Sequence, residues 1–295
     1  MKRSFLLLSG LTALLAACTE KVDLQSVSDY HDYLVVDAVL TDRPDAEQTI
    51  TLSRTVSYFH DESTPMVQGA RIRVNEVAFS EKDPGIYAAP EGFCCEPGKT
   101  YELRIELPDG SSYEASSSMP EKGFRLDAID YAYAGNAQTG LDSLWTLALW
   151  GQDDQVSSYY HIMLGVNGNF YPFEFTETLD DKYFNGNTVA GFPVTTLVQS
   201  EIFRKRYGDC FKYLEEGDVI TLRARTLDKG YFDFLIAQTL GGPTIPIFSP
   251  QPANTPTNIR GEHVLGWFAV CPEFSASVTV DDPFRPYFKR MLPGF

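Results

Sequence analysis

The sequence has little positive charge, and beyond its first residues it has no long apolar run. Lysine and arginine number 24 against 40 aspartates and glutamates, and the formal net charge is −16. A body this acidic repels nucleic acid and anionic lipid headgroups, and we see no basic stripe that would offset the repulsion. A membrane-spanning helix needs about 20 apolar residues, and no segment after residue 17 has them. We therefore expect no nucleic-acid partner and no spanning helix in the mature chain.

The short motifs of common enzyme classes are also missing. No GxSxG, SxxK or HExxH string occurs, so serine hydrolysis and zinc peptidase chemistry have no recognisable centre. His161 falls within a predicted strand and His263 begins one, and such histidines are more often structural than catalytic. Glycosidase chemistry requires only two carboxylates, which this acidic chain could supply without a motif. We expect a protein that is not an enzyme and has no cofactor, and we keep a surface glycan or peptide hydrolase as an alternative.

Metal sites are not expected either. The four histidines are scattered, and no CxxC or HxxxH spacing of zinc ligands occurs. The segment 180–187 offers carboxylate and amide oxygens to Ca²⁺, but it lacks the D-x-[DN]-x-[DN]-G loop and Lys182 intrudes. A turn built by Asn185-Gly186 explains the same residues more simply.

Cysteines are few, and the chain has five. Apart from Cys18 four remain, and this even number suits an oxidising compartment. Cys210 and Cys271 both lie in the C-terminal half and are the natural candidates for a structural disulfide. Cys94 and Cys95 are adjacent, so they form either a strained vicinal disulfide or bonds to separate partners.

What the sequence does contain is a bacterial lipoprotein signal over residues 1–17. Lys2 and Arg3 form its positive start, and an apolar stretch too short to span a membrane follows. The stretch ends in Leu15-Ala16-Ala17-Cys18, with small residues that suit a signal peptidase. We therefore expect cleavage before Cys18 and a covalent lipid on its sulfur.

Acylation at Cys18 determines how the protein meets the membrane. Each buried CH₂ contributes about 0.8 kcal/mol, so two or three acyl chains hold the protein for practical purposes permanently. Residues 18–29 are polar and without an apolar period, as expected of a lipidated tether. Thr19 is compatible with outer-membrane sorting, and Glu20 and Asp23 resemble the acidic signal that sends some lipoproteins to the cell exterior. We expect an outer-membrane protein anchored by lipid, with the extracellular face slightly favoured over the periplasmic one.

The dominant periodicity of the mature chain is two, which predicts an all-β fold. Residues 101–107 alternate strictly between apolar and charged side chains, and a turn at 108–110 leads into a returning strand. Further strands are expected at 33–40, 49–55 and 70–75. With turns at this spacing, residues 30–120 are predicted to form a β-sandwich.

The residues from 121 to 295 are expected to form a second β-rich domain, a sandwich or a barrel, with one helix. Pro120 and Gly123 break the strand pattern at the boundary. The helix is predicted to begin at Asp228 and to end at Gly241-Gly242, because apolar residues recur at helical spacing between them. The expected strands of this domain are 143–150, 158–166, 170–176, 219–226 and 263–270.

Candidate partner contacts come from aromatic and loop residues of the second half. Phe170 and Phe184 are the aromatic residues most expected to be exposed, because positions 171, 173 and 175 share one face and must mostly be core. Ile247 and Phe248 lie in the proline-rich segment 242–262, and loops on rigid β scaffolds often carry recognition.

Several segments in a fixed order resemble a known family. They are the lipoprotein signal with its acidic start, the strand pair 145–150 and 159–166, the turn 180–187, Glu216-Gly217-Asp218-Val219 before the aromatic helix 231–240, the string TNIRG at 257–261 and GWFA at 266–269. In that order they resemble the Bacteroidetes lipoprotein family called domain of unknown function 4249. The chain departs from the family at 261–264, where GEHV replaces a stretch rich in asparagine and glycine.

The resemblance implies a fold and a partner. It implies an N-terminal immunoglobulin-like sandwich and a second β-rich domain, and it supplies no catalytic residues. Its members are typically encoded beside TonB-dependent outer-membrane receptors, so such a receptor is the expected partner. We expect an accessory protein of a TonB-dependent nutrient uptake system that acts by binding a ligand or the receptor, with a surface adhesin or matrix-binding lipoprotein as the alternative. The ligand is not determined by the sequence.

Overall fold

The computed structural model describes residues 32–56, 64–121, 123–136, 143–241 and 255–290. The expected signal peptide, Cys18, the tether, Ile247 and Phe248 lie outside these ranges. Within them, no helix combines the length and the apolar character needed to cross a bilayer.

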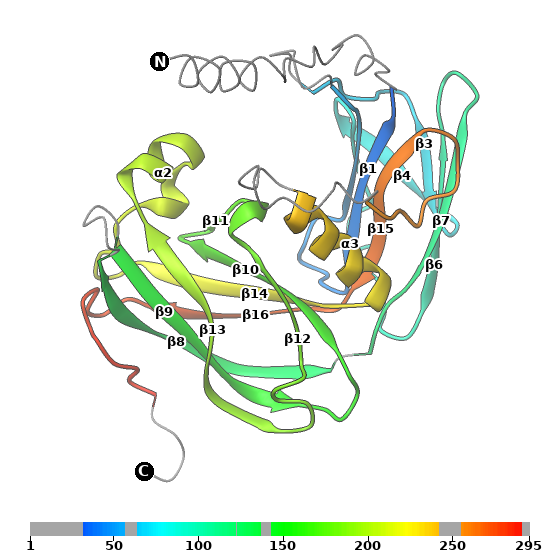
Figure 1. Ribbon diagram of the computed structural model, residues 1–295. Coiled ribbons are helices and arrows are strands. Elements are labelled where there is room, and N and C mark those ends of the chain that lie inside the picture. The colour runs from blue at the N-terminus through cyan, green and yellow to red at the C-terminus, as the bar shows by residue number, and fades with distance from the viewer. Residues whose placement is uncertain (1–31, 57–63, 122, 137–142, 242–254, 291–295) are drawn as a thin grey trace, which may run out of the picture.

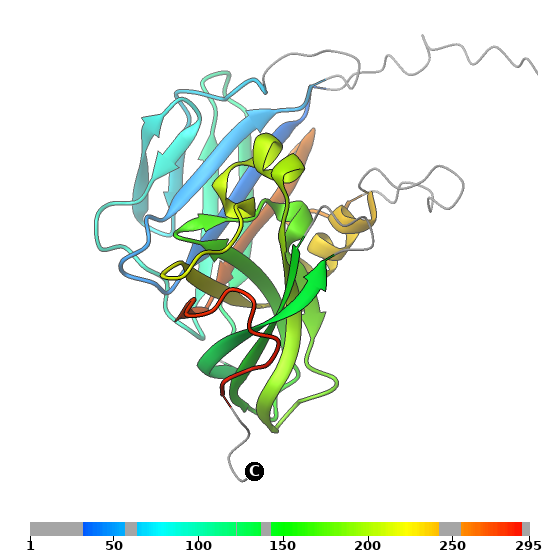
Figure 2. The same ribbon diagram turned by 90° about the vertical axis from the view of Figure 1, so that its left-hand side faces the viewer.

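The predicted all-β fold is confirmed. Where two sheets of a sandwich were expected for residues 30–120, the strands of this segment and β15 form one eight-stranded sheet, here called the barrel unit (Figures 1 and 2). The strand order is β15-β1-β2-β5-β4-β3-β6-β7. Its strands are β1 (Leu34–Thr41), β2 (Thr49–Arg54), β3 (Arg71–Val74), β4 (Val77–Asp83), β5 (Ile86–Ala88), β6 (Thr100–Glu106), β7 (Ser112–Ser118) and β15 (Val264–Cys271).

The sheet curves until its two edge strands nearly meet. Val270 on β15 donates from its backbone N–H to Oγ of Ser117 on β7, at 3.2 Å. The Asn258 side chain donates to the Phe268 carbonyl at 2.7 Å and lies beside the Ser116 carbonyl. Side-chain contacts therefore replace the backbone ladder that would close the barrel.

The alternation of residues 101–107 fills the barrel core as predicted. Tyr101, Leu103 and Ile105 are buried, while the charged residues between them are exposed. The turn that follows uses Gly110 at a φ of +89°, a conformation that an L side chain rarely adopts. The predicted strand pair is thus β6 and β7.

The second unit consists of two smaller sheets around a second core. One sheet has the order β11-β10-β14-β16, and β12 pairs with the same edge of β10 as β11 does, at the other end of the strand. The other sheet has the order β13-β9-β8. Their strands are β8 (Phe124–Asn136), β9 (Ser143–Asp153), β10 (Tyr159–Val166), β11 (Asn169–Phe170), β12 (Glu177–Asp180), β13 (Thr188–Gln199), β14 (Val219–Leu227) and β16 (Glu273–Thr279). Trp145, Phe211 and Leu222 lie in the core between these sheets, each almost fully buried.

Two α-helices are described where one was expected. The predicted helix is α3 (Lys229–Gly241), and Asp228 caps it by accepting the Tyr231 N–H at 2.9 Å. The unexpected helix is α2 (Glu201–Tyr207), capped by Ser200. It was missed because seven mostly charged and aromatic residues show no apolar period, and its stability comes from packing on the second core. Two 3₁₀ turns, η2 (Phe173–Phe175) and η3 (Asp209–Phe211), complete the unit, and η2 replaces most of the strand predicted at 170–176.

The chain crosses between the two units more than once. We expected residues 121–295 to form one domain, but β15 lies in the barrel unit, where it pairs in parallel with β1 from Leu34↔Val264 to Thr41↔Cys271. After Pro272 the chain enters β16 of the second unit at once. The chain therefore passes between the two units at the β15–β16 connection as well as near residue 120.

The expected disulfide between Cys210 and Cys271 does not form. Among the described residues, Cys94, Cys95, Cys210 and Cys271 all carry free thiols. Cys210 is buried in the core of the second unit, whereas Cys271 is buried in a different cluster beside α3. Burial raises the pKa of the Cys271 thiol to about 12, which favours an inert, protonated side chain.

Candidate functional site

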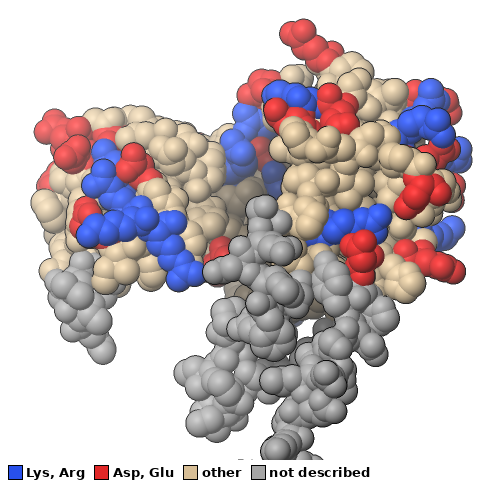
Figure 3. Space-filling model, turned by 90° about the horizontal axis from the view of Figure 1, so that it is seen from above, with Lys and Arg blue, Asp and Glu red and all other residues tan. Residues whose placement is uncertain are grey.

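The candidate site is a cavity of about 580 Å³ between the barrel and the second unit. From above, the surface is hollowed between the two lobes (Figure 3). Both units and the helix between them supply its walls, and we call it the inter-unit cavity. It is lined by Val35, Val36, Asp37, Val39, Thr49, Thr51, His161, Phe173, Arg225, Tyr231, Phe234, Leu235, Gln238, Gly266 and Trp267.

One wall of the cavity is the outer face of the barrel. Side chains alternate across β1, so Val36, Ala38 and Leu40 are buried in the barrel core while Val35 and Asp37 turn outward. Helix α3 packs against β15 beside this face, as both ribbon views show. The outer face of β1 is thus partly covered, and Asp37 projects from it into the cavity.

The Asp37 carboxylate is accessible to solvent, yet protein surrounds it on most sides. It makes no hydrogen bond and no ion pair with any described residue. Its surroundings raise the pKa of Asp37 by desolvation, and the nearby charge of Arg225 partly opposes this effect. A carboxylate without a cation partner in such a place is costly for the unoccupied protein.

His161 on β10 is a neutral hydrogen-bond acceptor in the opposite wall. Its Nε2 lies 2.9 Å from Oγ1 of Thr176, whose own hydroxyl donates to the Phe173 carbonyl. Nε2 must therefore donate, which leaves Nδ1 as a bare acceptor, and that buried atom has no partner among the described residues. Desolvation and the charge of Arg225 lower the pKa of His161 to about 4, so the ring is uncharged at neutral pH.

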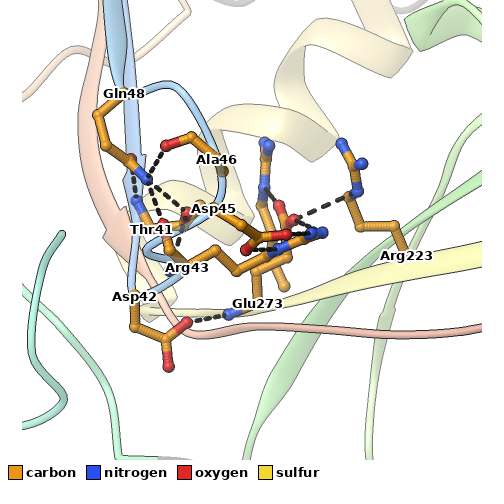
Figure 4. A network of polar contacts seen from close by, with 9 residues as sticks. Thr41, Asp42, Arg43, Asp45, Ala46, Gln48, Arg223 and Glu273 are labelled. Atoms are coloured by element: carbon orange, nitrogen blue, oxygen red, sulfur yellow. Dashed lines mark hydrogen bonds and ion pairs between the residues drawn. The ribbon is translucent and has the colours of Figure 1, made fainter. Parts of the chain in front are cut away.

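Arg225 is the cation of the cavity, and Glu273, the buried glutamate that Figure 4 shows beside Arg43 and Arg223, holds it in place. Its Nε donates to Oε2 of Glu273 at 2.8 Å. The Glu273 side chain is only 2% exposed, and it also accepts from Arg43 at 3.2 Å and pairs with Arg223 at 3.2 Å. Three arginines thus share one carboxylate at the junction of the units.

The same network fixes the loop between β1 and β2 to the second unit. Arg43 also pairs with Asp45 in this loop, and Gln48 accepts from the Thr41 N–H at 2.8 Å. Asp42 accepts the Glu273 N–H at 2.9 Å. Because the bonds of Arg43 and Asp42 to Glu273 cross between the units, the partner of Arg225 is fixed from both sides and the guanidinium is presented to the cavity in a well-defined position.

Aromatic side chains form the apolar part of the wall. Tyr231 and Phe234 of α3 contact Trp267 of β15, with ring centroids 6.4 and 5.4 Å from the indole. The Trp267 Nε1–H is buried without a partner among the described residues. Phe173 lies across from them, near the His161 ring.

This arrangement is suited to binding a small polar molecule. A negative group, a positive group and an aromatic wall line one concave space of the size that such ligands occupy. The described residues contain no group of three or more histidine, cysteine, aspartate or glutamate side chains placed to hold a metal ion.

The aromatic residues proposed from the sequence do not meet at this cavity. Phe170 lies under the guanidinium of Arg223, 4.2 Å from its Cζ to the ring centre. Phe184 is half-buried and packs against Phe124, Tyr160 and Phe192 at the edge of the second core. Both rings are half-buried, so the exposure expected of them is only partial.

Sequence reasoning missed the residues that do line the cavity, although one of them leaves a signal. Residues 34–40 read LVVDAVL, so both faces of this strand are apolar except for Asp37. A strand that is apolar on both faces is covered on both faces, and a lone charge within it marks a polar interior site. His161, Arg225 and Trp267 leave no comparable signal.

The comparisons with known proteins place the chain in a family without adding an activity. A search of curated proteins found no match. The model of a family described as a domain of unknown function (DUF4249) matches residues 19–277, a range that includes every residue of the inter-unit cavity. The chain therefore belongs to the DUF4249 family.

Proposed function

We propose that this protein is a lipid-anchored outer-membrane accessory protein of a TonB-dependent nutrient uptake system, and that it acts by binding. The inter-unit cavity is the observation that carries the binding role, because it joins unpaired polar groups to an aromatic wall. The sequence Leu15-Ala16-Ala17-Cys18 supports the lipid anchor. The receptor partnership rests on the family resemblance.

The anchor and the cavity serve one purpose in this proposal. Lipid on Cys18 confines the protein to the membrane plane that a receptor shares, which raises the effective concentration of each for the other. A modest protein–protein contact then suffices to keep a ligand-binding body beside the receptor. The ligand itself would be held in the cavity while it passes from solution to the receptor.

Binding fits the cavity better than catalysis does. His161 is uncharged, its Nε2 is engaged by Thr176 and its Nδ1 is buried, so it is poorly placed to move a proton to or from a ligand. Arg225 is committed to Glu273 through its Nε. These groups can orient a ligand, and the cavity-lining residues include no serine or cysteine beside them.

Co-purification from native membranes tests this proposal. The full-length protein, tagged at its C-terminus, is expressed in its own host and extracted in mild detergent, and partners are identified by mass spectrometry. We expect a TonB-dependent receptor to be recovered with it, and we expect Cys18→Ser to leave the membrane fraction and to lose the receptor. Cys94→Ser, which removes a half-buried free thiol, is the matched control and should retain both.

Recovery of the tagged protein alone, under conditions that preserve known receptor pairs, would contradict the receptor partnership. Retention of Cys18→Ser in the membrane fraction would contradict the lipid anchor. Display on whole cells without a receptor would instead favour the adhesin alternative.

A further inference from the structure

The inter-unit cavity is lined by one charged side chain of each sign, Asp37, which has no ion pair with a described residue, and Arg225, which pairs with Glu273 through its Nε. We propose that it binds a small zwitterionic ligand of the amino-acid or short-peptide class, with the ligand's ammonium group at Asp37 and its carboxylate at Arg225. This inference rests on the proposed binding function and names the ligand class for the same site.

Asp37 supplies the position for a cation. Its carboxylate is open to the cavity and has no partner among the described residues, and it extends from the middle of a regular strand that is paired on both sides. An ammonium group carries a full charge and three N–H donors, so it can satisfy such a carboxylate directly.

Arg225 supplies the position for an anion. Its Nε is fixed on Glu273, while its two terminal nitrogens make no hydrogen bond with any described residue. A guanidinium held in this way can present two parallel N–H donors to a carboxylate. Asp37 and Arg225 attract one another across the cavity but form no direct ion pair, so a ligand can lie between them.

The charges around the cavity favour a ligand without net charge. Among the residues that line the cavity, one side chain is an anion, Asp37, and one is a cation, Arg225, and the imidazole at position 161 is neutral. A ligand with only a positive or only a negative charge would leave a net charge inside the cavity. A zwitterion preserves the balance and at the same time satisfies both facing groups.

The size and the aromatic wall suit a ligand with an apolar side chain. About 580 Å³ is within the range of pockets that hold small organic ligands. Trp267, Phe234 and Phe173 offer ring faces on which such a side chain can pack. A neutral saccharide would also use these faces, but it would leave the Asp37 carboxylate without a cation.

Isothermal titration on the detergent-solubilised full-length lipoprotein tests the ligand class. The probes are phenylalanine and leucylphenylalanine with free termini, N-acetyl-leucylphenylalanine, leucylphenylalanine amide, and maltose as the neutral saccharide. We expect binding by the free probes, and we expect each blocked terminus to weaken binding of the dipeptide at least tenfold. Failure of both free probes to bind, equal binding of blocked and free dipeptides, or tighter binding of maltose would overturn the proposal.

A variant assigns the ammonium group to Asp37. Asp37→Asn should weaken binding of the free dipeptide at least tenfold and should leave binding of the N-acetylated dipeptide almost unchanged, because that probe has no ammonium group to lose. Asp83→Asn, the same substitution on an exposed position of β4, should change neither. An equal effect of Asp37→Asn on both dipeptides would overturn the assignment.

The thermal melting curve of Asp37→Asn shows whether the variant is folded, so a loss of binding can be separated from a loss of structure. A failure of the ligand class is also separable from a failure of the proposed function. Loss of dipeptide binding does not alter receptor co-purification, and absence of a receptor does not alter the titration.

Discussion

Arg285 donates a hydrogen bond from Nη2 to Oδ1 of Asp130 at 2.8 Å, across 155 positions of sequence. Both side chains are nearly inaccessible, with 3% and 6% exposed. The guanidinium also lies over the Tyr131 ring, 4.4 Å from its centre, and the Arg290 N–H donates to the second oxygen of Asp130. This buried pair fixes the C-terminal segment onto β8.

Arg285→Met should destabilise the protein by about 3 kcal/mol, because it leaves the buried Asp130 carboxylate without its cation. Urea denaturation followed by tryptophan fluorescence measures the loss. Arg125→Met breaks an ion pair of similar length with Asp127 on the exposed surface and should have no measurable effect. Equal losses in the two variants would show that the buried pair has no special role.

Glu273→Gln should also cost about 3 kcal/mol of folding stability, since three arginines would lose their shared charge partner at the junction of the units. The same denaturation experiment checks this value. Glu114→Gln, at an exposed position that pairs with Arg104, is the control and should behave as wild type. A stable Glu273→Gln variant would contradict the central place given to this carboxylate.

Asp37→Asn should raise the melting temperature of the ligand-free protein at pH 7. Because the pKa of Asp37 is raised in the folded state, the folded protein holds the proton to a higher pH than the unfolded chain does. The contribution of Asp37 to stability is therefore present below its unfolded pKa and is lost as the pH rises through its folded pKa. The difference in melting temperature between variant and wild type should shrink as the pH is lowered from 7 toward 4.

Differential scanning calorimetry between pH 4 and pH 8 measures this dependence, with Asp83→Asn as the control that should show none of it. A lower melting temperature for Asp37→Asn at pH 7 would mean that Asp37 supports the fold. Together with the binding titration, a gain in stability and a loss of binding in one variant would mark Asp37 as a residue kept for its ligand.

Gly266→Ala should prevent the barrel from closing. A Cβ at this position would lie 1.9 Å from the Val36 carbonyl oxygen, and Gly266 has a φ of +100°. Gly98→Ala has the same backbone problem at a φ of +77° but meets no atom within 4 Å, so it should cost only about 1–2 kcal/mol. Soluble yield and melting temperature distinguish the two variants, and a well-folded Gly266→Ala would contradict the close approach of β15 to β1.

The cysteine thiols should be free in the purified protein. Half-buried Cys94 should react with a thiol reagent in the native state, whereas Cys95, Cys210 and Cys271 should react only after unfolding. Burial raises the pKa of Cys95 and Cys271 to about 12, which further slows their reaction. Intact mass measured before and after reduction checks this point, and a two-hydrogen difference would reveal a disulfide.

Local patterns in the sequence predicted individual elements well. The alternation at 101–107 became β6, and Asp228 caps the predicted helix. These features depend on neighbours within a few residues, so periodicity and capping chemistry are enough to find them.

Features that depend on distant residues were not predictable. Nothing local shows that β15 pairs with β1, because the partner is determined by which edge the returning chain meets. The cavity combines side chains from β1, β10, β14, α3 and β15. No spacing of residues along the chain predicts that these side chains lie together. The predicted Cys210–Cys271 disulfide was wrong for the same reason. Both cysteines lie in the C-terminal half of the sequence, but the fold places them in different clusters.

Strand β15 also determines when the barrel sheet can finish folding. Leu34 of β1 pairs with Val264 of β15, so β1 keeps an open hydrogen-bonding edge until the chain has been synthesised as far as β15. Long-range parallel pairing is slow, and open edges invite pairing with other chains. A chain that ended after α3 would keep that edge permanently, and we expect it to aggregate.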